Sequence, residues 1–298
     1  MKRYCLYLFI LIGISCSAEL KAQKNGTVYK GNDPAVRYTG RTLVSPDGSV
    51  AFDWVGTYLE TRFTGGKLSV KVSETGTSYY NVFVDGKLHK VVKVCGTDTL
   101  IHLVSGIDKR IHSLKIQKRS EGEFGKTTVH QFVLSGSGRL AEEPAVRTRH
   151  IEFIGNSLTC GYGTDGKHRD EPFLVETENC NLTFASMVAR YYDADYTLIA
   201  HSGRGAARNY GDSVRVSKVT MKDRMLNTFD EDLTHKWNFK EYRPDLVVIN
   251  LGSNDFSTEP HPYKSEFTKA YKQILAQLRE HYGDIPILCI YPVAMQAP

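Results

Sequence analysis

The sequence predicts two domains, an all-β sandwich over residues 30–140 followed by an α/β domain with a parallel sheet over residues 149–298. Two observations support this prediction. The first half is a series of short runs of alternating apolar and polar residues, separated by turn-forming residues and without a clear helix, which is typical of a β-sandwich. The second half alternates apolar runs with helical periodicity, the pattern of successive βαβ units. A chain of 298 residues is long enough for each domain to bury its own core.

The strands of the first domain are marked by the residues between them. Asp85-Gly86 lies between the apolar runs Val82–Val84 and Lys87-Leu88, and this dipeptide suits the positive φ angles of a type I′ hairpin turn. Thr64-Gly65-Gly66-Lys67 separates a second pair of alternating runs. Gly136-Ser137-Gly138 and the polar stretch after it mark the domain junction. The other expected strands are Leu59–Phe63, Leu68–Val72, Thr99–Val104, His112–Gln117 and Val129–Leu134.

The second domain is expected to contain a sheet covered on both faces. Its strands are nearly continuous apolar runs, as parallel strands are when helices pack on both sides. Amphipathic helices are indicated around Phe184–Tyr191 and Phe267–Leu278, where apolar residues recur with helical spacing. The expected strands are residues 151–155, 196–200, 246–251 and 286–291.

Residues 1–22 have the pattern of a cleavable secretory signal peptide. Lys2-Arg3 is a basic start, and the apolar stretch Tyr4–Ile14 is too short to span a bilayer. Cleavage after Ala22 is the preferred interpretation, with Ala18 as the alternative. A lipid on Cys16 is a second interpretation, in which the mature protein is anchored to a membrane. The sequence therefore predicts export to the periplasm, the extracellular space or an outer-membrane-attached position.

Composition excludes several classes of function. The net charge of +5 is mild and forms no basic run with interleaved aromatic residues, so we expect no nucleic-acid partner. No further apolar segment is long enough to span a membrane. No Cys-x-x-Cys pair is present, which argues against a structural zinc site, and no cofactor or metal is expected. A Cys160–Cys180 disulfide and four buried thiols both remain open for the cysteines after the signal peptide, which are Cys95, Cys160, Cys180 and Cys289.

Three strand ends carry residues suited to acyl transfer. Ser157 lies in Gly155-Asn156-Ser157-Leu158, directly after an apolar strand, and is the candidate nucleophile. Gly205 and Asn254 follow the next two strands. Because the carboxyl ends of parallel strands meet at one edge of the sheet, the backbone N–H groups of Ser157 and Gly205 and the amide of Asn254 could form an oxyanion hole. A glycine permits close backbone approach, and an amide donates without titrating.

These segments resemble the first three conserved blocks of the SGNH (GDSL) hydrolase superfamily. The front domain is similar to the N-terminal jelly-roll domain of carbohydrate esterase family 2, through Phe63-Thr64-Gly65, the run Tyr79–Gly86 and Lys118-Arg119-Ser120-Glu121. The resemblance implies a jelly-roll sandwich followed by a three-layer, flavodoxin-like SGNH domain. It also implies deacetylation of a plant polysaccharide such as xylan or glucomannan through an acyl-enzyme on Ser157.

Two departures from the superfamily pattern stand out. Asn156 replaces the usual aspartate of the first block, and an amide can supply part of its hydrogen bonding. No Asp-x-x-His segment, the usual source of the base, follows Asn254. His201 precedes the glycine turn and is a weak alternative base, while His261 and His281 are expected at the surface. We therefore expect a C-terminally truncated hydrolase domain that is impaired as written.

The sequence thus predicts an exported serine ester hydrolase, an acetyl xylan esterase-like carbohydrate esterase that acts on acetylated plant polysaccharide or oligosaccharide. One alternative is a noncatalytic carbohydrate-binding protein with a decayed esterase domain. Another is a lipase-like SGNH hydrolase, against which the front domain argues. Candidate substrate-binding residues are Trp237, Arg204 and Phe256.

Overall fold

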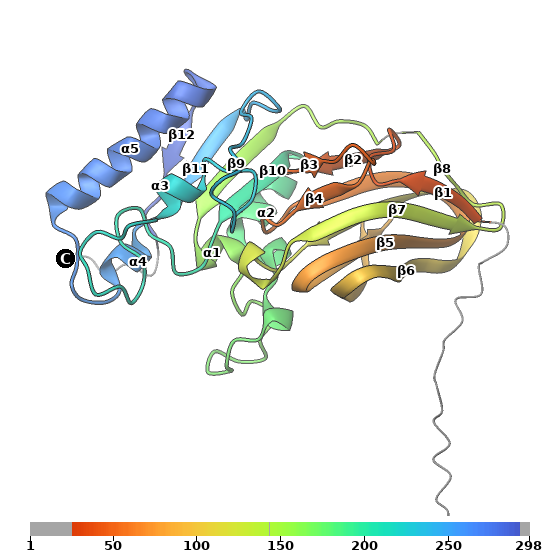
Figure 1. Ribbon diagram of the computed structural model, residues 1–298, viewed down its shortest axis with the longest axis horizontal. Coiled ribbons are helices and arrows are strands. Elements are labelled where there is room, and N and C mark those ends of the chain that lie inside the picture. Colours follow the sequence, from red (N-terminus) through yellow and green to blue (C-terminus); the bar gives the residue numbers. More distant parts are fainter. Residues whose placement is uncertain (1–25, 143, 293–298) are drawn as a thin grey trace, which may run out of the picture.

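The computed structural model describes residues 26–142 and 144–292, so the predicted signal peptide and Cys16 lie outside the described residues. A β-rich unit is followed by an α/β unit (Figure 1). The first unit contains the 3-10 helix η1 (Gly122–Phe124) and the strands β1 (Gly26–Lys30), β2 (Val36–Thr39), β3 (Leu43–Val44), β4 (Val50–Phe52), β5 (Tyr58–Val84), β6 (Lys87–Lys118), β7 (Thr127–Ser135) and β8 (Arg139–Leu140).

The α/β unit contains short and long helices around four strands. The strands are β9 (His150–Gly155), β10 (Asp195–Ala200), β11 (Leu246–Ile249) and β12 (Ile287–Cys289). The helices are α1 (Ser157–Cys160), η2 (Val175–Thr177), η3 (Cys180–Leu182), α2 (Phe184–Tyr191), α3 (Met221–Arg224), α4 (Ser253–Phe256) and α5 (Lys264–Tyr282).

The β-rich unit is built around two long, bent antiparallel strands. The hairpin at Asp85-Gly86 is confirmed, because β5 ends at Val84, β6 begins at Lys87, and both turn residues have positive φ angles of 50° and 75°. The expectation of separate strands on either side of Thr64–Lys67 is wrong. β5 runs through this segment and keeps pairing with β6, with register shifts around Gly66. The glycines bend the strand without ending it, as at a β-bulge.

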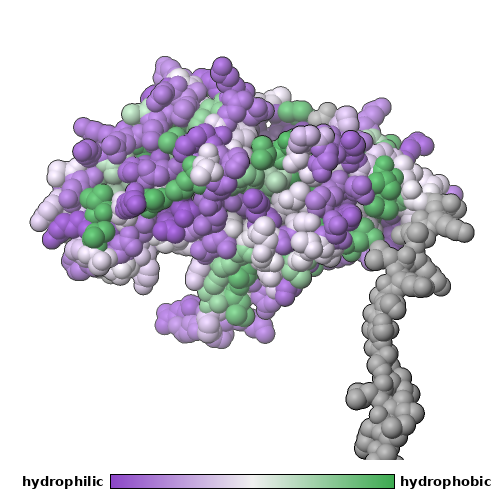
Figure 2. All heavy atoms as spheres, viewed as in Figure 1, coloured by the Kyte–Doolittle hydropathy of each residue, from purple (hydrophilic) through white to green (hydrophobic). Residues whose placement is uncertain are grey.

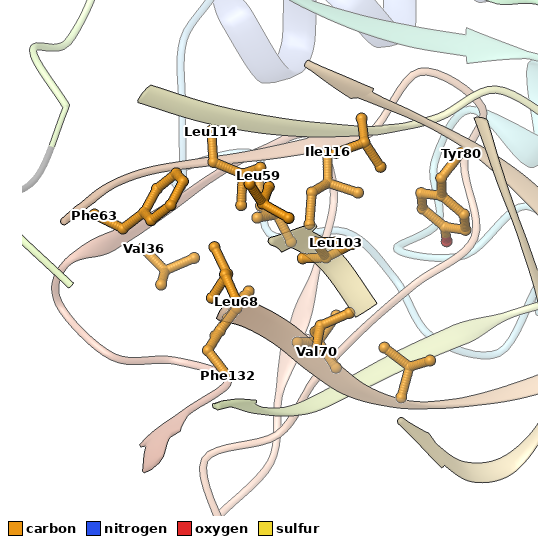
Figure 3. Packing of buried hydrophobic residues seen from close by; sticks show 14 of the residues in the cluster. Val36, Leu59, Phe63, Leu68, Val70, Tyr80, Leu103, Leu114, Ile116 and Phe132 are labelled. Carbon is orange, nitrogen blue, oxygen red and sulfur yellow. The ribbon is translucent and has the colours of Figure 1, made fainter. Parts of the chain in front are cut away.

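The core of this unit lies between its facing strand layers (Figure 3). Phe63, Leu68 and Phe132 are fully buried there, and residues of β5, β6 and β7 supply most of the other packed side chains. The alternation of buried and less buried residues along β7 has the period of two on which the strand prediction depends, with one shift at His130-Gln131, where the register with β5 changes.

The second unit contains a parallel sheet in the order β10-β9-β11-β12. Numbered along the chain, this order is 2-1-3-4, the start of a flavodoxin-like sheet. Neighbouring residues of β9 point to opposite faces: Phe153 packs with Ala185 and Ala189 of α2, and Ile154 packs with residues of α3 and α5. Helices therefore cover both faces, and the predicted fold class is confirmed.

The two units share a buried interface. Trp54 packs with the sheet residues Ile154 and Ile199, while Val55 and Tyr58 pack with Leu198 on the other side of β10. These three residues of the β-rich unit are at most 1% exposed, so they belong to the core of the α/β unit as much as to their own. No helix within residues 26–142 and 144–292 has the length and apolar character needed to cross a membrane.

Candidate active site

Ser157 lies at the carboxyl end of the central strand β9, as the first residue of the short helix α1. Its carbonyl oxygen accepts hydrogen bonds from Gly161 and Tyr162, at 2.9 and 3.2 Å. Its hydroxyl and its backbone N–H have no hydrogen-bond partner within the described part of the chain. The side chain is partly exposed. A half-exposed serine with an unpaired hydroxyl and an unpaired N–H is suited to act as a nucleophile beside an oxyanion hole.

Asn156 caps α1 and joins it to the segment after β11. Its Oδ1 accepts a hydrogen bond of 3.3 Å from the Leu158 N–H, as an aspartate at this position could. Its Nδ2 donates to Ser253 Oγ at 2.9 Å, a bond in which an ionised aspartate could only be the acceptor. The amide thus retains the turn and fixes the third block against the first.

Gly205 is held in a loop that is fastened by Asp255. The fully buried Asp255 carboxylate accepts hydrogen bonds from the N–H groups of Ala206, Ala207 and Arg208, at 3.0, 2.6 and 2.9 Å. A Cβ on Gly205 would lie 2.0 Å from the Arg208 carbonyl oxygen and 2.5 Å from Asp255 Oδ2. Glycine is therefore required here by the packing of its own loop, a reason different from the substrate approach inferred from sequence. The Gly205 N–H makes only a long contact of 3.4 Å with Asn209 Oδ1.

Asn254 links the second and third blocks. It lies on α4, where its Nδ2 donates to the Arg204 carbonyl oxygen at 2.8 Å. The second N–H of this amide has no acceptor within residues 26–142 and 144–292. This bond and the hydrogen bond between Asn156 and Ser253 bring together the segments that carry Ser157, Gly205 and Asn254, at one edge of the sheet.

His201 directly follows strand β10, and its contacts do not suit it to act as the base. Its Nδ1 lies 2.7 Å from Asp230 Oδ2, and its Nε2 lies 3.6 Å from Glu123 Oε2. Burial disfavours its charge, yet the Asp230 carboxylate outweighs burial and raises the pKa of His201. Both ring nitrogens thus face carboxylates of other residues. No hydrogen bond joins His201 to Ser157 within the described residues.

Neither of the other two candidate histidines is hydrogen-bonded to Ser157 within the described residues. His261 is partly exposed and contacts Glu259 at 3.5 Å. His281 stacks on Phe239 with ring centroids 3.8 Å apart, near the end of α5. These positions match the surface roles expected from sequence.

The candidate substrate residues fall into two groups. Arg204 lies in the Gly205 loop and Phe256 lies on α4 with its ring near Phe267, so both are close in the chain to oxyanion residues. Trp237 is 8% exposed and packs on Arg41 and Tyr242, below the middle of the sheet. The structure therefore places Trp237 in the core and does not bring it to the strand ends.

An aromatic edge beside Ser157 was not anticipated from sequence. Tyr162 is 49% exposed and stacks on Phe173 with centroids 3.7 Å apart, and Phe124 of the β-rich unit contacts Phe173 at 5.7 Å. These residues come from segments far apart in the sequence, so only the docking of the units reveals them. The loop after α1 projects from the body, and apolar side chains gather on it (Figures 1 and 2).

A cavity of about 320 Å³ opens between the units near this edge. It is lined by both aromatic and charged side chains, including Phe124, Phe229, Glu123 and Glu231. The nearby Asp53 receives the Asp230 N–H at 2.8 Å, and burial and the Asp230 carboxylate raise the pKa of Asp53 to about 7. All four described cysteines are free thiols, and Cys160 and Cys180 are buried. The structure therefore shows free thiols in place of the Cys160–Cys180 disulfide, and the alternative of four buried thiols is wrong for Cys95 and Cys289, which are exposed.

Comparison with known families matches both units in the same order. Residues 38–144 match the carbohydrate esterase 2 N-terminal family, and residues 153–298 match the GDSL-like lipase/acylhydrolase family. A solved family two carbohydrate esterase from Clostridium thermocellum, in complex with cellohexaose, superposes with a TM-score of 0.83 at 34% identity. That match covers 88% of this chain and 79% of the other.

The chain belongs to carbohydrate esterase family 2. Its relatives include the cellulase/esterase CelE of Acetivibrio thermocellus, 34% identical over 258 residues, which are 87% of this chain and 31% of CelE. An acetylxylan esterase/glucomannan deacetylase of Cellvibrio japonicus is 33% identical over 226 residues, 74% of this chain and 61% of that protein. The family 2 chain thus spans less than two thirds of the length of either relative.

Proposed function

We propose that this family 2 carbohydrate esterase removes acetyl groups from acetylated plant polysaccharide, with Ser157 as the nucleophile. The observation that carries the proposal is the unpaired hydroxyl and N–H of Ser157 at the edge where the Gly205 and Asn254 segments converge. These groups match the parts that acyl transfer needs, a nucleophile and donors aimed at the developing oxyanion.

The chemistry proceeds in two steps. Ser157 Oγ attacks the acetyl carbonyl, its proton passes to a base, and the sugar hydroxyl leaves with a proton returned by that base. Water then attacks the acetyl-serine and releases acetate. The N–H groups of Ser157 and Gly205 and the Asn254 amide stabilise the negative oxygen in both steps. We assign the base to none of the described histidines, because none of them is hydrogen-bonded to Ser157.

The substrate class is supported by the surface around the serine and by the relatives. Aromatic rings with exposed faces suit sugar rings, and Tyr162 lies one turn from Ser157, with its N–H bonded to the Ser157 carbonyl oxygen at 3.2 Å. The cavity beside Glu123 adds carboxylates that could accept hydrogen bonds from sugar hydroxyls. The related enzymes carry the names acetylxylan esterase and glucomannan deacetylase. We propose acetylated xylan or glucomannan on these grounds.

The test compares the full-length natural protein with Ser157→Ala on acetylated xylan and glucomannan, measuring acetate. Ser265→Ala, on the exposed face of α5, is the matched control. We expect acetate release by the wild type and the control, and a loss of about three orders of magnitude or more in Ser157→Ala. Cellohexaose binding without acetate release by any of the three would instead support a noncatalytic binding protein.

We also propose that the protein is exported, on the basis of the N-terminal signal pattern. N-terminal sequencing of the mature protein tests this proposal. A chain that begins after Ala22 or Ala18 supports a cleaved secretory signal, and a lipid-modified Cys16 at the N-terminus supports an anchor. An intact Met1 in a cytoplasmic fraction would contradict both.

A further inference from the structure

Two glutamates from different units meet in the interior behind the Gly205 loop. Glu121 follows β6 in the β-rich unit, and Glu178 lies between η2 and η3 in the α/β unit. Both residues are fully buried. A carboxylate oxygen of each and Cys160 Sγ lie within 4.8 Å of one another. Two carboxyl groups this close and this buried cannot both hold a full charge at low cost.

The side-chain carboxylate of Glu121 acts only as a hydrogen-bond acceptor. Its Oε2 accepts a hydrogen bond of 2.5 Å from the Ser202 N–H, and its Oε1 accepts from the Ser202 hydroxyl. Ser202 is the residue between the end of β10 and the Gly203–Gly205 turn. An ionised carboxylate satisfies both contacts as an acceptor, and hydrogen bonds to charged acceptors are the stronger kind. The β-rich unit therefore holds the start of the loop that carries Gly205.

The side chain of Glu178, in contrast, needs a proton on one of its oxygens. Its Oε2 accepts the Glu121 backbone N–H at 2.9 Å, but its Oε1 has no hydrogen-bond partner within the described residues. A proton on Oε1 would let this oxygen donate to the neighbouring Glu121 carboxylate. Burial, and then the charge of Glu121, raise the pKa of Glu178 to about 11, which agrees with a retained proton.

The charged groups around the pair do not remove the need for a proton on Glu178. The Lys118 ammonium donates to Ser78 Oγ and to the backbone oxygen of Glu121, at 2.7 and 3.2 Å, and not to either carboxylate. Arg119 is bonded to Asp165 and, at 2.6 Å, to the carbonyl oxygen of Glu178. A further group of charged residues from both units contact each other nearby, namely His201, Glu123, Asp230, Glu231, Arg224 and Asp53.

We propose that Glu121 is a positioning residue of the active site, held as a carboxylate by a proton that stays on Glu178. Through Ser202 the pair fixes the loop that carries Gly205. Through Cys160, the last residue of α1, it also borders the helix that carries Ser157. The inference rests on the proposed esterase function for its kinetic consequence alone, because the shared proton is a property of the folded protein.

The proposal predicts that two chemically identical residues respond differently to the same substitution. Glu178→Gln keeps an acceptor for the Glu121 N–H and supplies a permanent donor to the Glu121 carboxylate, so kcat and KM should stay within about threefold of wild type. Glu121→Gln replaces one of the two acceptor oxygens by a donor. Since the amide keeps one oxygen and gains one NH2, it can no longer accept from both the N–H and the hydroxyl of Ser202. Glu121→Gln should lower kcat about tenfold or more with KM within about threefold.

A measurement without substrate separates this inference from the proposed function. Hydrogen exchange of the Ser202 amide should accelerate in Glu121→Gln and stay slow in Glu178→Gln. If Glu121→Gln does not fold, Ser202→Ala, which removes only the hydroxyl donor, should lower kcat a few-fold. Equal damage from the two glutamine variants, or greater damage from Glu178→Gln, would overturn the proposal. Absence of esterase activity in the wild type would remove the proposed function and leave the exchange result to decide the inference.

The retained proton also has a thermodynamic signature. Between the ordinary glutamate pKa and the raised one, the folded protein holds one more proton than the unfolded chain, so its stability falls as pH rises. Glu178→Gln should flatten this fall between about pH 6 and about pH 9 in urea unfolding. An identical pH dependence in the two proteins would show that Glu178 folds as a carboxylate, and would overturn the proposal.

Discussion

The carboxylate of Asp255 accepts a hydrogen bond of 2.6 Å from the backbone N–H of Ala207. The same carboxylate also receives the neighbouring N–H groups of Ala206 and Arg208. A residue directly after Asn254 thus sets the path of the loop that carries Gly205, so the two sides of the proposed oxyanion hole are built as one unit.

Replacement of Asp255 should therefore damage both stability and activity. Asp255→Ala leaves three buried N–H groups without an acceptor, which should cost about 3 kcal/mol or more in the free energy of unfolding. Urea unfolding measures this loss, with the exposed Asp284→Asn as the control. A loss below about 1 kcal/mol would show that the loop finds other partners.

Asn254 should contribute to catalysis more than to folding. Asn254→Ala removes one proposed oxyanion donor, which typically costs about 10²–10³ in kcat. Acetate release under saturating substrate measures the effect. Asn238→Ala, whose side chain is exposed and bonded to Glu241, is the matched control. A change confined to KM would contradict a role at the oxyanion.

His201 should support structure without acting as the base. Because Asp230 raises the pKa of His201 in the folded protein, the pair stabilises the fold below about pH 6.5, the ordinary histidine value, and loses this effect as pH rises through the raised pKa. His201→Asn should destabilise the protein more at about pH 6 than at about pH 9, while retaining measurable acetate release. A loss of activity as complete as in Ser157→Ala, in a folded variant, would identify His201 as the base.

Asp195 should hold the two units together. Its carboxylate accepts hydrogen bonds from Arg37, Arg147 and Tyr58, at 2.6, 2.7 and 2.6 Å. Although burial opposes it, these contacts lower the pKa of Asp195 to about 2. The stabilisation is fully present above the ordinary aspartate pKa and is lost below it, as pH falls toward about 2.

Asp195→Asn should accordingly cost about 1.5–3 kcal/mol at neutral pH, because the partly buried Arg37 and Arg147 lose one of two carboxylate partners and keep Glu60. Asp193→Asn is the control, since Asp193 is 90% exposed and contacts Arg147 alone. Thermal unfolding at neutral and acidic pH compares them. A similar small shift in both variants would show that the ion pairs contribute little.

Much of the fold follows from periodicity in the sequence. The apolar runs gave the parallel sheet, and Asp85-Gly86 gave the hairpin, because both are local patterns. The continuity of β5 through Gly65-Gly66 was not visible in this way. Glycine marks a bend and a chain reversal equally well, and only the pairing with β6 distinguishes them.

The site was predictable where it follows strand ends and unpredictable where it depends on docking. Ser157, Gly205 and Asn254 follow β9, β10 and β11 in order, so their convergence comes from topology. The Glu121–Glu178 pair and the Tyr162–Phe173–Phe124 edge join distant segments, and no local pattern signals them. Trp237 looked available for stacking because composition does not show that Arg41 and Tyr242 enclose it.

The central claim is that an acetyl group passes through Ser157. Rapid quenching of the full-length protein during turnover of an acetylated xylan oligosaccharide, followed by peptide mass spectrometry, tests it most directly. We expect one acetyl group on the peptide that contains Ser157. It should be absent in Ser157→Ala and retained in the Ser265→Ala control. Acetate release at the wild-type rate by Ser157→Ala, or acetylation at another residue in its place, would contradict it.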